Sequence, residues 1–323
     1  MSALPRPAVP GGAAVAPGTP TSAVPLVFPR ALTIGVIGSG RVGAVLAAAF
    51  TAAGHRVVAA SGRSQVSRDR IALLLPGAAL RTPDEVATAA TDLLLIAVPD
   101  DAIAGVVTGL AERGRLHPGQ VVAHTSGAHG LAPLAAAGAA GAHPLALHPA
   151  MTFTGTPEDL GRLPAISYGV TAPPQLRTLA TRLVADLGGV PEWIDESARC
   201  LYHAALAHGA NHLVTLVNEA VDRLRDAGVT RPEKVLAPLL RAALDNALRL
   251  GDTALTGPVS RGDAATVAGH LDELDRVAPE SVPAYLALAR RTADRAIADG
   301  RLRPTDAELL LGVLADRRKE EVG

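Results

Sequence analysis

Up to Asp195, the chain alternates between short apolar runs and longer amphipathic stretches. Apolar runs of strand length occupy residues 33–38, 55–61, 92–99, 120–127, 142–149, 164–171 and 190–195. Apolar residues at helical spacing follow at residues 41–54, 82–90, 100–114 and 173–188. Strands that alternate with helices predict a mainly parallel sheet covered by helices on both faces.

After Asp195 the pattern becomes helical throughout. Residues 196–228 predict one long helix, and further helices are predicted over residues 232–251 (with Pro238 inside), 262–277, 279–300 and 304–321. The predicted fold class is therefore α/β, with a doubly wound Rossmann domain over residues 31–195. An all-helical domain for substrate binding and dimerisation is predicted over residues 196–323.

Residues 1–30 are rich in Pro, Gly and Ala and contain no basic segment followed by an apolar core. They predict a disordered tail rather than a signal peptide or a helix. No apolar run elsewhere approaches the ~18 residues that a membrane span needs.

Composition and net charge narrow the choice of partners, cellular compartment and catalytic residues. The formal net charge of −1 gives no reason to expect a nucleic-acid or membrane partner, so we expect a small-molecule substrate. The one cysteine, Cys200, excludes an internal disulfide and indicates a reducing, cytoplasmic compartment; we expect it to be a small core residue. Lysine occurs only at Lys234 and Lys319, which limits lysine-based catalysis to two candidates.

A glycine-rich loop joins the first predicted strand to the first helix. Its sequence, IGVIGSGRVG over residues 34–43, fits G-x-G-x-x-G in the strand–loop–helix context of a dinucleotide phosphate cradle. The helix N-terminus would supply free N–H groups and a positive dipole end. The predicted cofactor-binding residues here are Gly38, Ser39, Gly40, Arg41, Val42 and Gly43. The alternative is a glycine turn without a ligand.

The second predicted strand lacks the acid that often binds the ribose of NAD. It ends in Ser61-Gly62-Arg63-Ser64 instead, which offers a guanidinium and hydroxyl donors to a 2′-phosphate. This end therefore predicts NADP(H) as the cofactor, although Arg63 could also be a solvated surface residue.

Three further strand ends carry polar candidates. Val98-Pro99-Asp100 should lie beside the nicotinamide half of the cofactor, or Asp100 and Asp101 simply cap the next helix. His124, His143 and His148 also lie at predicted strand ends. We interpret His124, Ser126 and His148 as substrate-binding, with structural histidines as the alternative.

Six motifs occur in order: IGVIGSGRVG, AVPDDAI, HTSGAHG, HPLALHPAMTF, YHAALAHGANHL and TGPVSRGD. On these, residues 31–317 resemble the bacterial Rossmann-like oxidoreductases with a C-terminal helical domain of unknown function. More distantly, the layout resembles ketopantoate reductase, pyrroline-5-carboxylate reductase, prephenate dehydrogenase and the 3-hydroxyacid dehydrogenases, with a 6-phosphogluconate dehydrogenase-like helical domain. The resemblance implies NAD(P)H on the first domain, substrate beneath the second, and a homodimer made by the helical domain.

The sequence departs from these relatives at one catalytic position. Ketopantoate reductases and 3-hydroxyacid dehydrogenases use a lysine on the first long helix of the second domain, and this helix has none. The resemblance places His203 about where that lysine would lie, and a straight helix at ~100° per residue places Asn211 roughly 80° around from it. His203 and Asn211 are therefore the catalytic candidates. Tyr202 is interpreted as packing, with a role as an acid as the alternative.

The helical half offers two more candidates. Arg261, in the loop of residues 254–263, could hold a substrate carboxylate, or could pair with Asp263, which also suits the N-cap of the next helix. His208 and His212 have the i, i+4 spacing of zinc ligands, but no third ligand is evident, so no metal is expected.

Two functions fit these observations. The first is a soluble NADP-dependent oxidoreductase that exchanges hydride with a small, anionic carbonyl, imine or hydroxy-acid substrate, with ketopantoate as the leading specific guess. The second is a non-catalytic NADP(H)-binding or sensing protein. Convergence of the candidate histidines and Arg261 on the nicotinamide would favour the enzyme, and their dispersal would favour the sensor.

Overall fold

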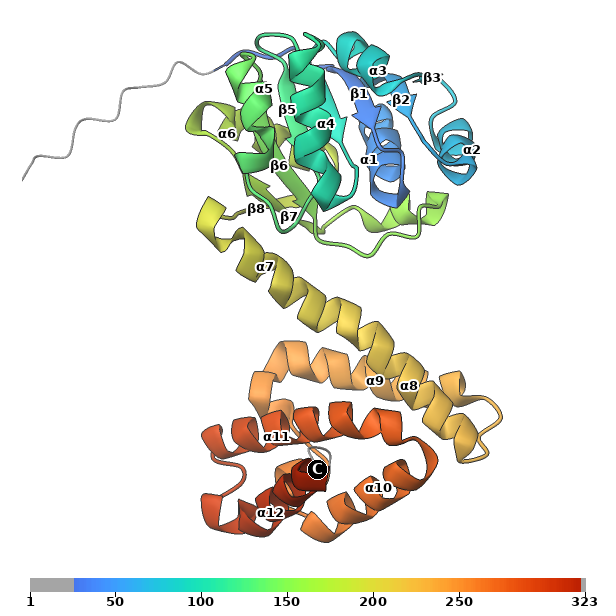
Figure 1. Ribbon diagram of the computed structural model, residues 1–323, viewed down its shortest axis with the longest axis vertical. Coiled ribbons are helices and arrows are strands. Elements are labelled where there is room, and N and C mark those ends of the chain that lie inside the picture. Colours follow the sequence, from blue (N-terminus) through green and yellow to red (C-terminus); the bar gives the residue numbers. More distant parts are fainter. Residues whose placement is uncertain (1–25, 321–323) are drawn as a thin grey trace, which may run out of the picture. The chain divides into compact units, whose positions relative to one another are not determined.

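The computed structural model describes residues 26–320, with side chains to residue 315. The chain divides into two compact units between Leu206 and Ala207 (Figure 1). We call them the N-terminal unit and the C-terminal unit. The expected boundary between Asp195 and Glu196 precedes this division. The predicted tail lies mostly outside the described residues, but Leu26 and Phe28 pack against the first hydrophobic core.

An eight-stranded sheet forms the centre of the N-terminal unit, in the order β3-β2-β1-β4-β5-β6-β7-β8. All neighbouring strands are parallel except β6 and β7, which are antiparallel. The strands are β1 (Thr33–Ile37), β2 (Arg56–Ser61), β3 (Ala79–Leu80), β4 (Leu93–Ile96), β5 (Val121–His124), β6 (His143–Pro149), β7 (Ser167–Thr171) and β8 (Val190–Trp193). The predicted doubly wound α/β fold is confirmed.

Helices cover both faces of this sheet (Figure 1). They are α1 (Arg41–Ala52), α2 (Gln65–Leu74), α3 (Pro83–Ala89), α4 (Asp100–Glu112), α5 (Ala135–Ala139) and α6 (Arg177–Asp186). Strand alternation divides the interior into two cores: Leu95 packs in one, and Leu94 and Ile96 in the other. The sequence pattern did not predict α2 or β3, while the capping box at Thr82 and Glu85 does begin α3.

The long helix predicted over residues 196–228 is not uniform. It consists of a 3₁₀ turn (Glu196–Ala198), α7 (Arg199–Leu206), a π-helical turn (Ala207–Asn211) and α8 (His212–Asp226). The units divide where the π turn begins. A π turn changes the rotation per residue, so the angle expected between His203 and Asn211 from a straight α-helix is wrong.

The C-terminal unit contains α8, α9 (Pro232–Leu250), α10 (Ala264–Val277), α11 (Val282–Ala298) and α12 (Pro304–Glu320). Its core lies among the last three helices and includes Val267, Leu271, Leu286, Ala293 and Leu310. No residue of α8 is buried, and α9 buries only Pro232 and Leu236. These two helices therefore contribute little to the core of their own unit.

Candidate active site

The glycine loop between β1 and α1 has the backbone shape of a phosphate cradle. Gly38 adopts φ +94°, and a Cβ there would lie 2.5 Å from the Ala97 carbonyl oxygen. A Cβ on Gly43 would lie 2.3 Å from the Gly38 oxygen, so α1 packs directly on the loop. Around Gly40, by contrast, no heavy atom would lie within 4 Å of a Cβ. Only the middle glycine opens onto free space, as the approach of a pyrophosphate requires.

The hydrogen-bond donors of the cradle come from the start of α1. The N–H groups of its first turn have no intrahelical partner, and no acidic side chain lies there. The Ser39 N–H donates to the Ser61 oxygen over 2.9 Å, so it serves the loop rather than a ligand. The Ser39 hydroxyl is buried without a hydrogen-bond partner among the described residues. These features fit a bound anion.

The residues after β2 include a positively charged side chain, Arg63, that has no partner in the described part of the chain. Ser64 caps α2 by accepting from the Ser67 N–H over 3.1 Å, and a Cβ on Gly62 would lie 2.9 Å from the Ser67 Cβ. Arg63 is exposed, and its guanidinium forms no hydrogen bond or ion pair with the described part of the chain. Its carbonyl oxygen accepts from Arg68. Arg63 is therefore available to an anionic ligand beside the cradle.

A second loop, which the sequence did not indicate, lies against the cradle. Arg70 of α2 donates through Nε to the Gly155 oxygen (3.0 Å) and through Nη1 to the Ser39 oxygen (3.5 Å). Asp159 holds this loop by accepting from Thr154 and Gly155. Burial opposes ionisation of Asp159, but these hydrogen bonds lower its pKa overall. The cradle is thus fixed from two sides.

The ends of β4 and β5 are joined by a side-chain hydrogen bond. The Ser126 hydroxyl donates to the Asp100 carboxylate over 2.8 Å and accepts from the His129 N–H over 3.2 Å. The N-cap of α4 is Pro99, so capping by Asp100 or Asp101 is wrong. Val98 is half-buried beside Pro99. Cofactor contact by these residues, and substrate contact by Ser126, stay predictions.

His124 holds the loop that follows β5. It is fully buried, its Nδ1 accepts from the Ser126 N–H (3.1 Å), and its Nε2 lies 2.6 Å from the Gly130 oxygen. Burial, countered in part by the Gly130 bond, lowers its pKa to about 4. The neutral ring is therefore protonated on Nε2, which donates to Gly130. With both nitrogens engaged, His124 shapes the loop, and its contact with substrate stays a prediction.

The same loop is fastened to the 3₁₀ turn that precedes α7. The Glu196 carboxylate accepts from the N–H groups of Leu131 (2.7 Å) and Ala132 (3.2 Å). A Cβ on Gly130 would lie 2.0 Å from this carboxylate, so Gly130 is needed for the contact. The loop of residues 125–131 therefore has a fixed position relative to α7.

Arg199, the first residue of α7, was missed by the sequence analysis and is 1% exposed. Its Nε donates to the Thr171 hydroxyl (2.7 Å), and its Nη2 donates to the oxygens of Ala146 (3.3 Å) and Gly169 (3.1 Å). Its Nη1 has no partner among the described residues. One buried guanidinium thus binds β6, β7 and α7 together. The pattern of polar residues gave no signal for this, because a helix-start arginine usually faces solvent.

A cluster of two histidines and a tyrosine lies one turn after Arg199. The Tyr202 hydroxyl lies 3.0 Å from Nδ1 of His148, and the two rings meet edge to face. His203 packs against His148 with ring centroids 6.0 Å apart. A Cβ on Gly127 would lie 2.7 Å from His203 Cδ2 and 3.0 Å from His148 Nε2. Glycine at this position leaves both imidazoles facing the loop after β5.

Burial controls ionisation in this cluster. It lowers the pKa of His148 to about 4, assisted by the nearby His203 and the Arg199 charge. Burial also raises the pKa of Tyr202, although the Arg199 charge acts in the opposite direction. At neutral pH His148 is therefore uncharged and Tyr202 keeps its proton.

The remaining candidates lie elsewhere. His143 begins β6, at the opposite edge of the sheet from His124 and His148, so its expected place near the site is wrong. Cys200 is exposed rather than a core residue. Asn211 and Arg261 belong to the C-terminal unit and both are exposed. Their roles stay predictions.

Two further predictions for the helical half, the role of Asp263 and the pairing of His208 with His212, can be compared with the structure. Asp263 caps α10, as expected, by accepting from the Thr266 N–H and hydroxyl. No ion pair joins Asp263 to Arg261 within the described residues. The Nδ1 atoms of His208 and His212 lie 3.3 Å apart, but no group of three potential metal ligands occurs in the described part of the chain.

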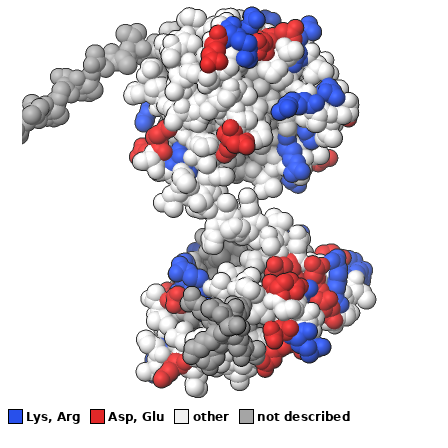
Figure 2. Space-filling model, viewed as in Figure 1, with Lys and Arg blue, Asp and Glu red and all other residues white. Residues whose placement is uncertain are grey.

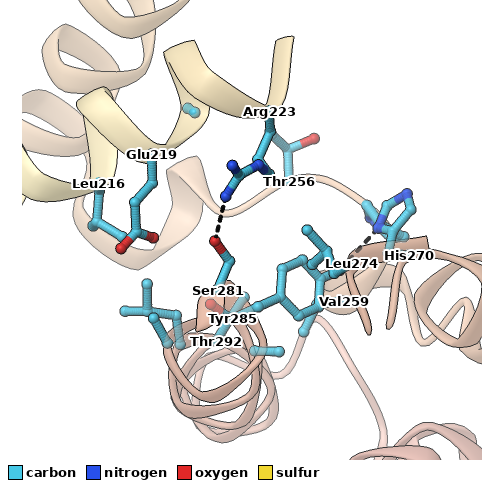
Figure 3. A pocket seen from close by; sticks show the side chains of 15 residues that line it. Leu216, Glu219, Arg223, Thr256, Val259, His270, Leu274, Ser281, Tyr285 and Thr292 are labelled. Atoms are coloured by element: carbon cyan, nitrogen blue, oxygen red, sulfur yellow. Dashed lines mark hydrogen bonds between the residues drawn. The ribbon is translucent and has the colours of Figure 1, made fainter. Parts of the chain in front are cut away.

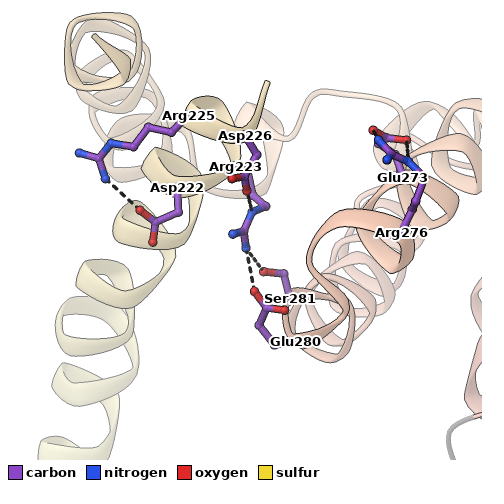
Figure 4. A network of polar contacts seen from close by, with 8 residues as sticks. All are labelled: Asp222, Arg223, Arg225, Asp226, Glu273, Arg276, Glu280 and Ser281. Carbon is purple, nitrogen blue, oxygen red and sulfur yellow. Dashed lines mark hydrogen bonds and ion pairs between the residues drawn. The ribbon is translucent and has the colours of Figure 1, made fainter. Parts of the chain in front are cut away.

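The C-terminal unit has an apolar cavity of about 450 Å³ between α8, α10 and α11 (Figure 3). Leu216, Leu274 and Leu288 line it, with Glu219 at one side. Arg223 of α8 donates to the Ser281 hydroxyl over 2.8 Å and pairs with Asp226 and Glu280 (Figure 4). This network joins the cavity wall of α8 to the start of α11.

Both halves of the chain match families. Residues 17–149 match the family model of a Rossmann-like domain, and residues 166–292 match that of a domain of unknown function, DUF2520. The chain therefore joins a Rossmann-like domain to a DUF2520 domain, which confirms the resemblance drawn from the six motifs. No curated protein matches the sequence. Among the described residues, no helix has both the length and the apolarity to cross a membrane.

Solved structures share the fold across most of the chain. A protein from Bacteroides fragilis assigned as an NADP oxidoreductase is 22% identical, with a TM-score of 0.71 over 82% of this chain and 98% of its own. The reductive aminase of Aspergillus terreus, in complex with NADPH and ethyl levulinate, is 19% identical, with a TM-score of 0.59 over 84% and 95%. Pyrroline carboxylate reductase of Plasmodium falciparum, with NADP bound, is 12% identical, with a TM-score of 0.55 over 86% and 98%.

The open space at Gly40 and the crowding at Gly43 predict different effects of alanine. Gly40→Ala should fold with unchanged stability, since Gly40 has φ −70° and no nearby atom, but should bind NADPH, the cofactor expected from the sequence, at least about tenfold more weakly. Gly43→Ala should destabilise the protein by about 1–3 kcal/mol through overpacking. Urea unfolding and calorimetric titration measure both effects. Unchanged NADPH affinity in Gly40→Ala would contradict the cradle.

Proposed function

We propose that the protein is an NADP(H)-dependent reductase of small molecules that contain a C=O or C=N bond. One observation carries the proposal: the phosphate cradle follows β1, and His148, against which Tyr202 and His203 pack, lies at the carboxyl end of β6, which runs in the same direction in the same sheet. In doubly wound folds, cofactor and reacting groups meet at this edge. Solved structures with the same fold are named as an NADP oxidoreductase, an imine reductase and a reductive aminase, which supports the class.

The residues at this edge suit NADP(H). Gly40 leaves room for a pyrophosphate, the first turn of α1 supplies N–H donors, and Arg63 offers a free guanidinium to a 2′-phosphate. No acidic residue stands at the end of β2 to repel that phosphate. The expected cofactor contacts of Gly38 to Gly43 and of Ser61 to Ser64 are kept in the proposal.

In the proposed reaction, side chains of the protein supply the proton and orient the substrate. When bound, NADPH provides the hydride, which adds to the carbon of C=O or C=N and leaves NADP⁺, while a proton completes the alcohol or amine. His203 is the proposed proton donor, beside His148 at Gly127. Asn211 and Arg261 are kept as proposed orienting and carboxylate-binding residues. The sequence favoured ketopantoate, whereas the named structural neighbours favour C=N substrates.

The convergence of His148 and His203 supports catalysis over simple cofactor sensing. A sensor would need the cradle but no pair of imidazoles packed together against the loop after β5. His124, by contrast, is explained by its loop contacts alone.

A homodimer is part of the proposal, formed through α8 and α9. These helices expose large apolar residues: Leu213, Val214, Leu216, Val235, Leu239, Leu244, Leu248 and Leu250. Broad uncharged areas separate the charged groups in the view of Figure 2. Apolar faces of this extent on two adjacent helices mark an interaction surface, and a second copy of the chain brings an equal apolar face to cover it.

The free guanidinium of Arg63 predicts a preference for NADPH over NADH. Charge-assisted hydrogen bonds to the 2′-phosphate should favour NADPH by roughly 10–150-fold. Arg63→Ala should remove this preference and leave NADH affinity unchanged, while Arg30→Ala, at another exposed arginine, should keep it. Calorimetric titration with both cofactors measures the ratio. Equal affinities in the unmodified protein would exclude the proposed role.

Loss of His203 should affect turnover rather than cofactor binding. A screen of keto acids and cyclic imines, followed by NADPH absorbance, identifies a substrate. His203→Ala should then lower kcat by ~10²–10⁴-fold, because general acid catalysis is lost. NADPH affinity should not change, and His203→Lys should keep some activity. His143→Ala, at the opposite sheet edge, is the control. Near-full turnover in His203→Ala would remove the assignment.

Charges placed on α9 should separate the dimer. Leu244 and Leu248 lie one turn apart and are 52% and 81% exposed. Leu244→Glu/Leu248→Glu should weaken association roughly 100-fold or more, because an interface would bury these side chains. Leu73→Glu, on exposed α2, should have no effect. Sizing chromatography with light scattering measures the mass of the assembly for each variant. A monomeric unmodified chain at micromolar concentration would contradict the homodimer.

A further inference from the structure

We propose that Tyr202 is a positioning residue, which holds His148 in the tautomer that carries its proton on Nε2 and points it toward Gly127. His148 would then donate a hydrogen bond to the oxygen or nitrogen of the substrate while His203 supplies the proton. The proposal rests on the function proposed above, and it assigns Tyr202 a role other than packing or acid.

The geometry brings the Tyr202 hydroxyl to the inner nitrogen of His148. The hydroxyl lies 3.0 Å from Nδ1, and the rings are nearly perpendicular at 88°, with their centroids 5.6 Å apart. The outer nitrogen, Nε2, is the atom that a side chain at Gly127 would meet at 3.0 Å. One nitrogen is therefore committed to Tyr202, and the other lies on the side of the ring that faces Gly127.

The direction of the hydrogen bond follows from the other contacts of Tyr202. Both partners are neutral at pH 7, since burial lowers the pKa of His148 and raises that of Tyr202. Nδ1 of His148 is the one hydrogen-bond partner of the Tyr202 hydroxyl among the described residues, so the phenol proton has an acceptor only if it is directed to Nδ1. The guanidinium of Arg199, 6.0 Å from the phenol ring, makes that hydroxyl a stronger donor.

A neutral imidazole that accepts at Nδ1 must carry its proton on Nε2. Burial keeps His148 neutral, and of the charged or titratable groups near it, His203, Arg199, Asp100 and His124, only Asp100 favours a charged ring. The Nε2–H group is then a fixed donor at the loop after β5. A fixed donor costs no reorganisation when charge develops on a substrate atom.

The chain contains a matched pair that serves as a control. In the C-terminal unit, the Tyr285 hydroxyl lies 2.8 Å from Nδ1 of His270, with perpendicular rings and centroids 6.0 Å apart. This pair belongs to the C-terminal unit, and the proposed chemistry assigns it no role. Tyr285→Phe therefore changes the same kind of contact at a different histidine.

Nitrogen NMR of the ¹⁵N-histidine-labelled chain, without cofactor or substrate, tests the tautomer directly. His148, identified by its loss in His148→Gln, should show an unprotonated Nδ1 and a protonated Nε2. Tyr202→Phe should convert this into a mixture of tautomers, and Tyr285→Phe should leave it unchanged. A protonated Nδ1 in the unmodified chain, or one unchanged tautomer in Tyr202→Phe, overturns the proposal whether or not the protein is a reductase.

Kinetics with an identified substrate gives the second readout. Tyr202→Phe should lower kcat about 10–100-fold with little change in KM for NADPH, because a misplaced donor weakens transition-state contact. His143→Ala, at the opposite ends of the strands, should keep kcat. Unchanged kcat in Tyr202→Phe, together with the expected NMR change, would overturn the role of His148 in turnover. Absence of any turnover in the unmodified chain would instead count against the proposed function.

Discussion

The arrangement of the site depends on the buried guanidinium of Arg199. It satisfies the backbone oxygens of Ala146 and Gly169 and the Thr171 hydroxyl, and so ties β6, β7 and the first turn of α7 together. Tyr202 and His203 follow within one turn, which places them against His148 of β6. Hydrogen bonds to a charged group contribute ~1.5–3 kcal/mol each, and a buried oxygen left without a hydrogen bond is destabilising. The contacts of Arg199 therefore hold α7 firmly against β6 and β7.

The same cation shapes the electrostatics of the sheet edge. Burial is the main cause of the lowered pKa of His124 and of His148, and the Arg199 charge acts in the same direction on both rings. The two neutral histidines have different roles. Both ring nitrogens of His124 form hydrogen bonds within its loop, whereas His148 has one nitrogen at Tyr202 and the other facing Gly127. A buried, neutral histidine such as His148, whose Nε2 has no hydrogen-bond partner among the described residues, is better suited to donating a hydrogen bond than to carrying a charge.

Much of this architecture could be predicted from the sequence. The alternation of apolar runs gave the strands and most helices, and the spacing of Gly38, Gly40 and Gly43 gave the cradle, because both depend on local pattern. Helix α2 was missed since only Ile71 of its residues is buried. Arg199, Arg70 and the Glu196 contact were missed because each bonds to backbone far along the chain. The π turn at residues 207–211 also leaves no mark in apolar spacing, so a straight helix was expected.

We expect the cradle and the histidine cluster to serve one bound cofactor, and a crystal structure of the chain with NADP⁺ would show whether they do. In that structure the pyrophosphate should lie over Gly40, the 2′-phosphate on Arg63, and the nicotinamide ring against the loop at Gly127 with its reactive face toward His148 and His203. A nicotinamide ring bound away from Gly127, with both imidazoles out of its reach, would contradict this expectation.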